Sequence, residues 1–214
     1  MKLLVVGSGG REHAIAKKLL ASKDVDQVFV APGNDGMTLD GLDLVNIGIS
    51  EHSRLIDFAK ENEIAWTFIG PDGPKVIEFN SRFGDPETQI ILPRLTSDFA
   101  QNIDDIMMGI EPYITWQKDG VTLGVVVASE GYPLDYEKGV PLPEKTDGDI
   151  ITYYAGAKFA ENSKALLSNG GRVYMLVTTE GSVKAGQDKI YTQLAQQDTT
   201  GLFYRNDIGS KAIK

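Results

Sequence analysis

The chain has 214 residues, a formal net charge of −9 and no cysteine. The length suits one large or two small domains, and the acidity argues against non-specific binding to nucleic acid or to an anionic membrane. The lack of thiols excludes disulfides, zinc thiolates and a cysteine nucleophile. The N-terminal apolar run stops at Gly7 and is too short to span a membrane. We therefore expect a cytoplasmic protein with no nucleic-acid or membrane partner.

The first third of the chain alternates strand-like and helical segments. Continuous apolar runs predict strands that are covered on both faces, and apolar residues spaced four apart predict helices. In chain order these are a strand at 2–6, a helix at 11–22, strands at 27–31 and 44–47, a helix at 54–62 capped by Ser53, and a strand at 66–69. Such alternation predicts a doubly wound parallel sheet, a Rossmann-like α/β fold.

The remainder changes character near residue 115. The predicted elements are a strand at 75–79, a loop at 80–85, a helix from Pro86 capped by Asp85, a helix at 97–108 ended by Gly109, strands at 121–128, 150–154 and 172–178, a turn at Asn169-Gly170 and a helix at 182–197. In the helix at 97–108, we expect Phe99, Ile103, Ile106 and Met107 to share a buried face. The last hundred residues predict an α+β domain with a mostly antiparallel sheet.

The junction between the two patterns is unusual. The strand at 66–69 meets the strand at 75–79 across Gly70-Pro71-Asp72-Gly73-Pro74. Local rules predict a hairpin around such a turn. The preceding βαβ pattern instead predicts a helix after each strand, so the two predictions conflict at this point.

The first strand and first helix are joined by Gly7-Ser8-Gly9-Gly10, followed by Arg11 and Glu12. A helix N-terminus with free amides and a positive dipole end favours an anion, and Arg11 adds charge. The dinucleotide fingerprint GxGxxG fails because Glu12 stands at its third glycine. The acidic residue expected directly after the second strand is missing, because Ala31-Pro32-Gly33-Asn34 stands there, so a nicotinamide oxidoreductase is disfavoured. The turn predicts a phosphate-bearing ligand, or otherwise a tight turn that needs glycine only for its backbone angles.

The loop after the second strand is Pro32-Gly33-Asn34-Asp35-Gly36. Ligands of open parallel sheets bind at the carboxyl ends of strands, so this loop and the glycine-rich turn are expected to share one crevice. Asn34 offers a donor and an acceptor to sugar hydroxyls. An ordinary turn rich in Gly and Asn is an equal interpretation.

Glu78 and Asn80 lie two apart on a predicted strand and therefore point to one side. A carboxylate beside an amide oxygen suits Mg²⁺. Arg82 follows on the same side, where its charge would neutralise a transferred phosphate. A solvated strand face with a weak Glu–Arg pair is the alternative.

Several motifs then occur in one order along the chain. They are GSGGREHA at 7–14, APGNDG at 31–36, PKVIEFNSRFGDPETQ at 74–89, ASEGYP at 128–133, GGRV at 170–173 and YRNDIG at 204–209. Together they resemble the phosphoribosylamine–glycine ligase family, and the resemblance covers almost the whole chain.

The resemblance implies an ATP-grasp enzyme of purine biosynthesis. ATP phosphorylates the carboxylate of glycine, and the amine of 5-phosphoribosylamine attacks the glycyl phosphate to give glycinamide ribonucleotide. It implies ATP and Mg²⁺ (or Mn²⁺) as cofactors, Glu78 and Asn80 as metal ligands and Arg82 as the catalytic cation. The resemblance also implies that the glycine-rich turn belongs to the phosphoribosylamine site, with Asn34 nearby. The turn residues in question are Gly7, Gly9, Gly10, Arg11 and Glu12. Arg172 and Arg205 would edge the substrate cleft, although a structural role is the stronger interpretation for both.

Family members are about twice as long, which resolves the conflict at the junction. The resemblance places a seam between Asp72 and Gly73, where the rest of the ATP-grasp core and its lid would stand. We therefore expect a substrate-binding domain at 1–72, a remnant of the ATP-grasp core at 73–114 and an α+β domain at 115–214. The hypothesis is that this form is an inactive ligase, monomeric or weakly self-associating. The alternative is a non-catalytic module that binds phosphate or sugar phosphate.

Overall fold

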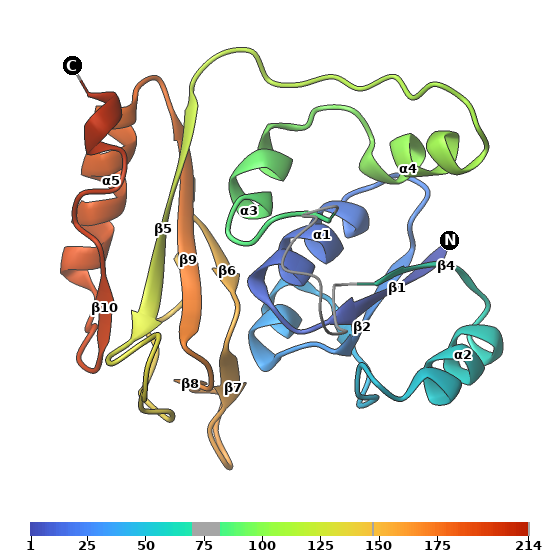
Figure 1. The fold of residues 1–214 in the computed structure, drawn as a ribbon, viewed down its shortest axis with the longest axis horizontal. Coiled ribbons are helices and arrows are strands. Elements are labelled where there is room, and N and C mark those ends of the chain that lie inside the picture. Colours follow the sequence, from blue (N-terminus) through green and yellow to red (C-terminus); the bar gives the residue numbers. More distant parts are fainter. Residues whose placement is uncertain (70–81, 147, 214) are drawn as a thin grey trace.

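The computed structural model describes residues 1–69, 82–146 and 148–213. The predicted hairpin at 70–74 and the predicted strand at 75–79 lie outside these residues. Within them, a parallel sheet forms the N-terminal part and an antiparallel sheet the C-terminal part, as predicted. Figure 1 shows α1 (Gly10–Leu20) and α3 (Thr88–Ile91) between the two sheets.

The first sheet is parallel throughout, with strand order β3-β2-β1-β4. Its strands are β1 (Lys2–Gly7), β2 (Gln27–Pro32), β3 (Asp43–Leu44) and β4 (Ile64–Ile69). Helix α1 packs on one face, where Leu3, Val5 and Ile15 share a core. Helix α2 (His52–Glu61) packs on the other, where Leu4, Val6 and Leu55 meet. Alternate β1 residues face opposite cores, which explains its unbroken apolar run.

Helix α4 (Phe99–Met107) and the 3-10 turn Leu92–Arg94 extend the first core. Leu92, Leu95 and Phe99 pack with the α1 side of the sheet. The predicted α4 face is wrong in part, because Ile106 and Met107 are 59% and 63% exposed. Only the first turns of α4 reach the core, so its last turn contributes no buried side chain.

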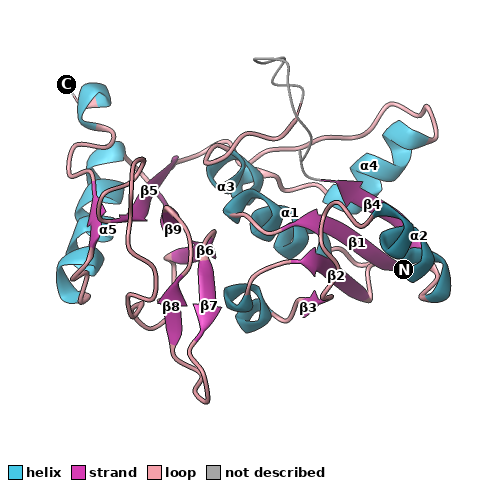
Figure 2. Cartoon of the chain, turned by 60° about the horizontal axis from the view of Figure 1, so that its bottom comes forward, coloured by secondary structure: helices cyan, strands magenta, loops and turns pink. Residues whose placement is uncertain are grey.

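The second sheet is antiparallel, with order β10-β5-β9-β6. These strands are β5 (Val121–Ser129), β6 (Ile151–Tyr154), β9 (Arg172–Glu180) and β10 (Leu202–Tyr204). Helix α5 (Val183–Gln196) covers its outer face, as Figure 2 shows, and buries Ile190 and Leu194 as predicted. A separate hairpin pairs β7 (Ala157–Phe159) with β8 (Leu166–Ser168).

Two predicted helix starts differ from the structure. Helix α2 begins at His52 rather than after Ser53; its N-cap residue is Glu51, whose side chain accepts from the Gly48 amide at 2.7 Å and from no amide of the helix. Asp85 does not cap a helix from Pro86, since α3 begins at Thr88. The chain bends at Gly170 and Gly171, at the turn predicted for Asn169-Gly170, and so passes from β8 to β9, which lie in different sheets. In the described ranges, no helix is long and apolar enough to cross a membrane.

Candidate functional site

The glycine-rich turn connects β1 to α1 at the carboxyl edge of the sheet. Gly7 has a φ of +139°, and a Cβ placed there would lie 2.5 Å from Cγ of Glu12. Glycine is therefore required at this position by both its backbone angle and the close side chain. The turn is held tightly against its own helix, and this conformation presents the first amides of α1.

Glu12 folds back over the turn and is almost fully buried. Its Oε2 accepts from the amide of Gly9 at 2.9 Å, while its Oε1 accepts from Nε of Arg11 at 2.5 Å. Arg11 also donates to the carbonyl oxygen of Phe83 at 3.4 Å. The carboxylate thus satisfies one of the orphan amides of the helix N-terminus. Arg11 neutralises that carboxylate, which lets the remaining amides retain their attraction for an anion.

Asn34 joins the second loop to the turn. Its Nδ2 donates to the Ser8 carbonyl at 2.8 Å and to the Tyr154 carbonyl at 3.4 Å, and its Oδ1 accepts from the Gly36 amide. The two loops therefore lie at one edge of the sheet, as their place after neighbouring strands predicts. In this arrangement the Asn34 side chain bonds to the backbone, which also fits the ordinary-turn interpretation.

A third segment reaches the turn from the middle of the chain. Asp85 accepts from Nε2 of Gln89 at 2.9 Å and from Nη2 of Arg172 at 3.3 Å, and its carbonyl accepts from Nη1 of Arg172 at 3.0 Å. A Cβ built on Gly10 would lie 2.9 Å from Nε2 of Gln89. The DPETQ and GGRV motifs, 87 residues apart at Asp85 and Arg172, thus meet beside the glycine-rich turn.

Gln89 is buried, and its Oε1 has no hydrogen-bond partner within the described ranges. Sequence reasoning assigned Asp85 only a capping role and gave Gln89 none. The DPETQ motif is the signal in the sequence that could have identified Asp85 and Gln89, because it places several polar residues together in a segment that the structure packs against the turn. Buried polar groups need hydrogen-bond partners. Asp85, Gln89 and Arg172 therefore form a polar cluster where the three segments meet.

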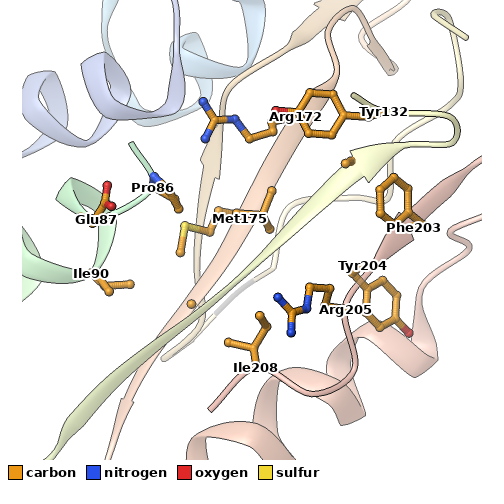
Figure 3. Close-up of a pocket in the computed structure, with 13 residues that line it drawn as sticks. Pro86, Glu87, Ile90, Tyr132, Arg172, Met175, Phe203, Tyr204, Arg205 and Ile208 are labelled. Atoms are coloured by element: carbon orange, nitrogen blue, oxygen red, sulfur yellow. The ribbon is translucent and has the colours of Figure 1, made fainter. Parts of the chain in front are cut away.

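The cavity beside this cluster has a volume of about 410 Å³. Figure 3 shows Pro86, Glu87 and Ile90 on one side and Met175 of β9 on the facing sheet. Its walls are mainly apolar, and arginines stand at separate places on its rim. Arg172 pairs with Asp85, while Arg205 makes a two-bond pair with Asp207 at 2.7 and 2.9 Å. Their charges are thus already balanced by carboxylates.

The remaining predicted residues are placed only in part. Glu78 and Asn80 lie outside the described residues, so the expectation that their side chains point to the same side of a strand stays a prediction. Arg82 is described and exposed, and stands in the loop that leads to α3. Over residues 1–69, 82–146 and 148–213, no group of three His, Asp or Glu side chains is arranged to hold a metal ion. No geometry for the expected Mg²⁺ can therefore be derived from these residues.

Sequence reasoning took His13 as a helix residue with a satisfied ring and no catalytic role, and both of its ring nitrogens have partners in the structure. It is fully buried, its Nδ1 accepts from the Tyr154 amide at 3.0 Å, and its Nε2 lies 3.0 Å from Oδ2 of Asp40. Burial lowers the pKa of His13, against the hydrogen bond and charge of Asp40. Hydrogen bonds from His13, Lys145 and Lys17 outweigh burial and hold the pKa of Asp40 well below its usual range. The cluster joins α1 to β6, so it belongs to the interface between the two sheets.

Comparison with known proteins identifies relatives of both parts. Residues 1–96 match the family model described as phosphoribosylglycinamide synthetase, N domain, and residues 122–211 match the C domain of the same enzyme. A phosphoribosylamine–glycine ligase of Streptococcus pyogenes serotype M18 (strain MGAS8232) is 49% identical over 420 aligned positions, covering 100% of both chains. That of Streptococcus pneumoniae (strain ATCC BAA-255 / R6) is 42% identical over the same length and coverage.

The aligned length and the fold add two facts. This chain has 214 residues, so about half of the 420 aligned positions have no residue here. A crystal structure of phosphoribosylamine–glycine ligase from Thermotoga maritima aligns with a TM-score of 0.73 and 15% identity, covering 97% of this chain and 100% of that chain. At this identity the likeness supports the fold alone, and the sequence relatives carry the family.

Proposed function

The chain belongs to the phosphoribosylglycinamide synthetase family of purine biosynthesis ligases, and from that premise we propose that its site serves the ATP-dependent joining of glycine to 5-phosphoribosylamine. The reaction passes through glycyl phosphate and yields glycinamide ribonucleotide. One observation carries the proposal: residues from the GSGGREHA, APGNDG, DPETQ and GGRV motifs meet at the glycine-rich turn. Binding residues are concentrated on loops that a rigid scaffold positions, and ligands of open parallel sheets bind at the carboxyl ends of the strands, where these segments meet.

In this proposal, the first turn of α1 binds the phosphate of phosphoribosylamine. Gly7, Gly9 and Gly10 let the backbone approach the ligand, and the helix dipole favours its charge. Glu12 fixes the turn through the Gly9 amide, and Arg11 balances the carboxylate. Asn34 holds the second loop in place beside the sugar.

The cofactors are assigned by family resemblance. Glu78 and Asn80 are proposed to hold Mg²⁺ or Mn²⁺, and Arg82 to face the phosphates of ATP. A divalent ion bound there would neutralise charge on phosphate oxygens.

We further propose that this form of the chain lacks ligase activity. About half of the aligned positions of the S. pyogenes relative have no residue here, and sequence reasoning places the missing part between Asp72 and Gly73. Phosphoryl transfer needs ATP held in place and closed from water. The sugar-phosphate site would be common to this form and to the alternative function, a non-catalytic module that binds phosphate or sugar phosphate, whereas the metal pair would belong to the ligase alone.

Calorimetric titration separates the two functions. Ribose 5-phosphate is the stable probe for the sugar-phosphate site, and ATP with Mg²⁺ is the probe for the nucleotide site. We expect the first to bind and Arg172→Ala to weaken it about tenfold, or about 1.4 kcal/mol, because the carboxylate of Asp85 would then lose its partner and repel a phosphate at the turn. Arg54→Ala is the matched control, since Arg54 is an exposed arginine paired to Glu51 on α2.

The outcomes are distinct. Nucleotide binding that Glu78→Gln removes, with sugar-phosphate binding unchanged, would support a ligase remnant. Binding of the sugar phosphate alone would support the module. Equal loss in Arg172→Ala and Arg54→Ala would overturn the site assignment. Formation of glycinamide ribonucleotide by the 214-residue chain would refute its inactivity.

A further inference from the structure

The end of strand β6 lies between the two loops of the candidate site. A Cβ built on Gly10, in the glycine-rich turn, would lie 3.3 Å from Cβ of Ala155. One built on Gly36, in the second loop, would lie 2.5 Å from Cγ of Tyr154. Since protein interiors are close-packed, residues 154 and 155 set the distance between the turn and the second loop.

The backbone of Tyr154 is bonded on both of its sides. Its amide donates to Nδ1 of His13 at 3.0 Å, and its carbonyl accepts from Nδ2 of Asn34 at 3.4 Å. The same Nδ2 donates to the Ser8 carbonyl in the glycine-rich turn at 2.8 Å. A shift of the Tyr154 backbone would therefore reach Asn34 and, through it, the turn.

The ring of His13 is itself held in one state. Its side chain is fully buried, so it does not touch a ligand at the turn. Its Nε2 lies 3.0 Å from Oδ2 of Asp40, whose Oδ1 accepts from Lys17 and Lys145. An ionised carboxylate only accepts, so Nε2 carries the proton and Nδ1 is left to accept from the Tyr154 amide. Asp40 thus fixes the tautomer and the orientation of the ring.

We propose that His13 is a positioning residue of the sugar-phosphate site. By accepting from the Tyr154 amide, it holds the end of β6 where the Tyr154 carbonyl fixes Asn34 beside the glycine-rich turn. The second sheet thereby shapes a site that lies at the edge of the first. This inference rests on the proposed sugar-phosphate binding. The competing interpretation is that His13 only stabilises the interface between the two sheets.

Two substitutions separate the roles of the two ring nitrogens. In His13→Asn the side-chain oxygen stands as many bonds from Cα as Nδ1 does, so it can accept from the Tyr154 amide, but it is too short to reach Asp40. In His13→Gln the terminal amide stands as far out as Nε2, so it reaches Asp40 and leaves the Tyr154 amide without its acceptor. Each variant therefore loses one of the two contacts. His52→Gln is the control, since His52 is exposed at the start of α2.

Calorimetric titration with ribose 5-phosphate, at a temperature where circular dichroism shows each variant folded, measures the effect. We expect His13→Gln to weaken binding about tenfold, because the Tyr154 amide loses its acceptor and the end of β6 shifts. His13→Asn and His52→Gln should stay within about threefold of the unsubstituted chain, since the Tyr154 amide keeps an acceptor in both. Equal weakening in the two His13 variants would support the interface interpretation and overturn the proposal, as would full binding by His13→Gln.

A ligand-free measurement separates this inference from the proposed function. The Gly33 amide donates to the Gly7 carbonyl at 3.1 Å, so its hydrogen exchange reports whether the second loop stays on the turn. We expect exchange at Gly33 to be about tenfold faster in His13→Gln and unchanged in His13→Asn. Equal exchange in the two variants would overturn the positioning role. A lack of binding by the unsubstituted chain would refute the proposed function alone.

If His13→Gln does not fold, the unsubstituted chain decides. Linkage between a site and a contact on which it depends is reciprocal, so saturating ribose 5-phosphate should slow hydrogen exchange at the Tyr154 amide. The Leu194 amide is the reference, because it lies on the buried face of α5 and reports the gain in global stability. Slowing at Tyr154 that exceeds the slowing at Leu194 is the expected result, and equal slowing at the two amides would overturn the proposal.

Discussion

At the scale of single residues, two motif glycines are needed for close packing between distant segments. A Cβ built on Gly36 would lie 2.5 Å from Cγ of Tyr154, and one built on Gly10 would lie 3.3 Å from Cβ of Ala155. Neither glycine has a left-handed backbone angle. The absence of a side chain, and not backbone freedom, is therefore what these positions require. The APGNDG motif thus serves packing against the C-terminal sheet as well as its loop.

Gly36→Ala should destabilise the chain by about 1–3 kcal/mol, because the added methyl overpacks against a buried aromatic ring. The matched control is Gly181→Ala, where a built Cβ meets nothing within 4 Å. That control should change the free energy of unfolding by less than about 0.5 kcal/mol. Urea unfolding followed by circular dichroism measures both. A Gly36→Ala variant as stable as the control would contradict the packing argument.

At the scale of elements, Asp98 ties α4 to the end of α1. Its side chain accepts from the Gln101 amide at 3.1 Å as the helix cap and from the Lys23 amide at 3.2 Å. The hydroxyl of Ser22 also donates to it. Sequence periodicity began this helix at residue 97, whereas α4 itself starts at Phe99 after the Asp98 cap. The cap fixes where α4 starts, because the Asp98 carboxylate accepts from an amide of α4 and also from the hydroxyl and amide that follow the end of α1.

Asp98→Ala should cost about 0.5–2 kcal/mol of stability, the range for loss of an N-cap. Asp98→Asn should cost less, because asparagine is an equally good cap. Asp104→Ala on the same helix removes a carboxylate without removing the cap, and is expected to have an effect below about 0.5 kcal/mol. Thermal unfolding of the three variants tests this order. If Asp104→Ala were as damaging as Asp98→Ala, helix charge rather than capping would explain the effect.

At the scale of the whole molecule, the two sheets meet through α1, and His13 is the central buried contact. Its two ring nitrogens contact the Tyr154 amide and Asp40, which also accepts from Lys17 at 3.0 Å and Lys145 at 2.5 Å. The contact requires a neutral ring that accepts at Nδ1 and donates at Nε2. The division at 1–72, 73–114 and 115–214 stays a prediction, although Leu92 and Phe99 pack into the first core.

Stability should therefore fall as the pH falls below about 6.5. Burial lowers the pKa of His13 in the folded chain, so the unfolded chain takes up the proton first. The contribution of neutral His13 is complete above the unfolded pKa and is lost below it, with a slope of up to about 1.4 kcal/mol per pH unit. Urea unfolding between pH 7.5 and 5 measures the slope before most carboxylates titrate.

The two histidines of the chain provide the comparison. His13→Gln should flatten the slope in this window, because a glutamine does not titrate. His52→Gln should retain it, since His52 is an exposed residue at the start of α2. A His13→Gln variant with the slope of the unsubstituted chain would show that another group causes the pH dependence.

Sequence by itself determined the local elements and the family. Apolar runs and helical spacing predicted β1, α1, β2 and α5, because the burial of one strand or one helix face is written in a few neighbouring residues. The ordered motifs identified the ligase family, because each motif is a short run of neighbouring residues that can be read directly from the sequence. Local rules erred at Asp85 and at Ile106 and Met107, where distant partners or their absence decide the outcome.

Only the tertiary structure decided which distant residues meet. The pairing of Asp85 with Arg172 and the burial of His13 against Tyr154 each join segments separated by tens of residues. No periodicity of 2 or 3.6 residues records such contacts, because they depend on how two sheets pack around α1. The sequence thus determined the parts and their family, whereas packing between those parts determined which residues meet at the candidate site.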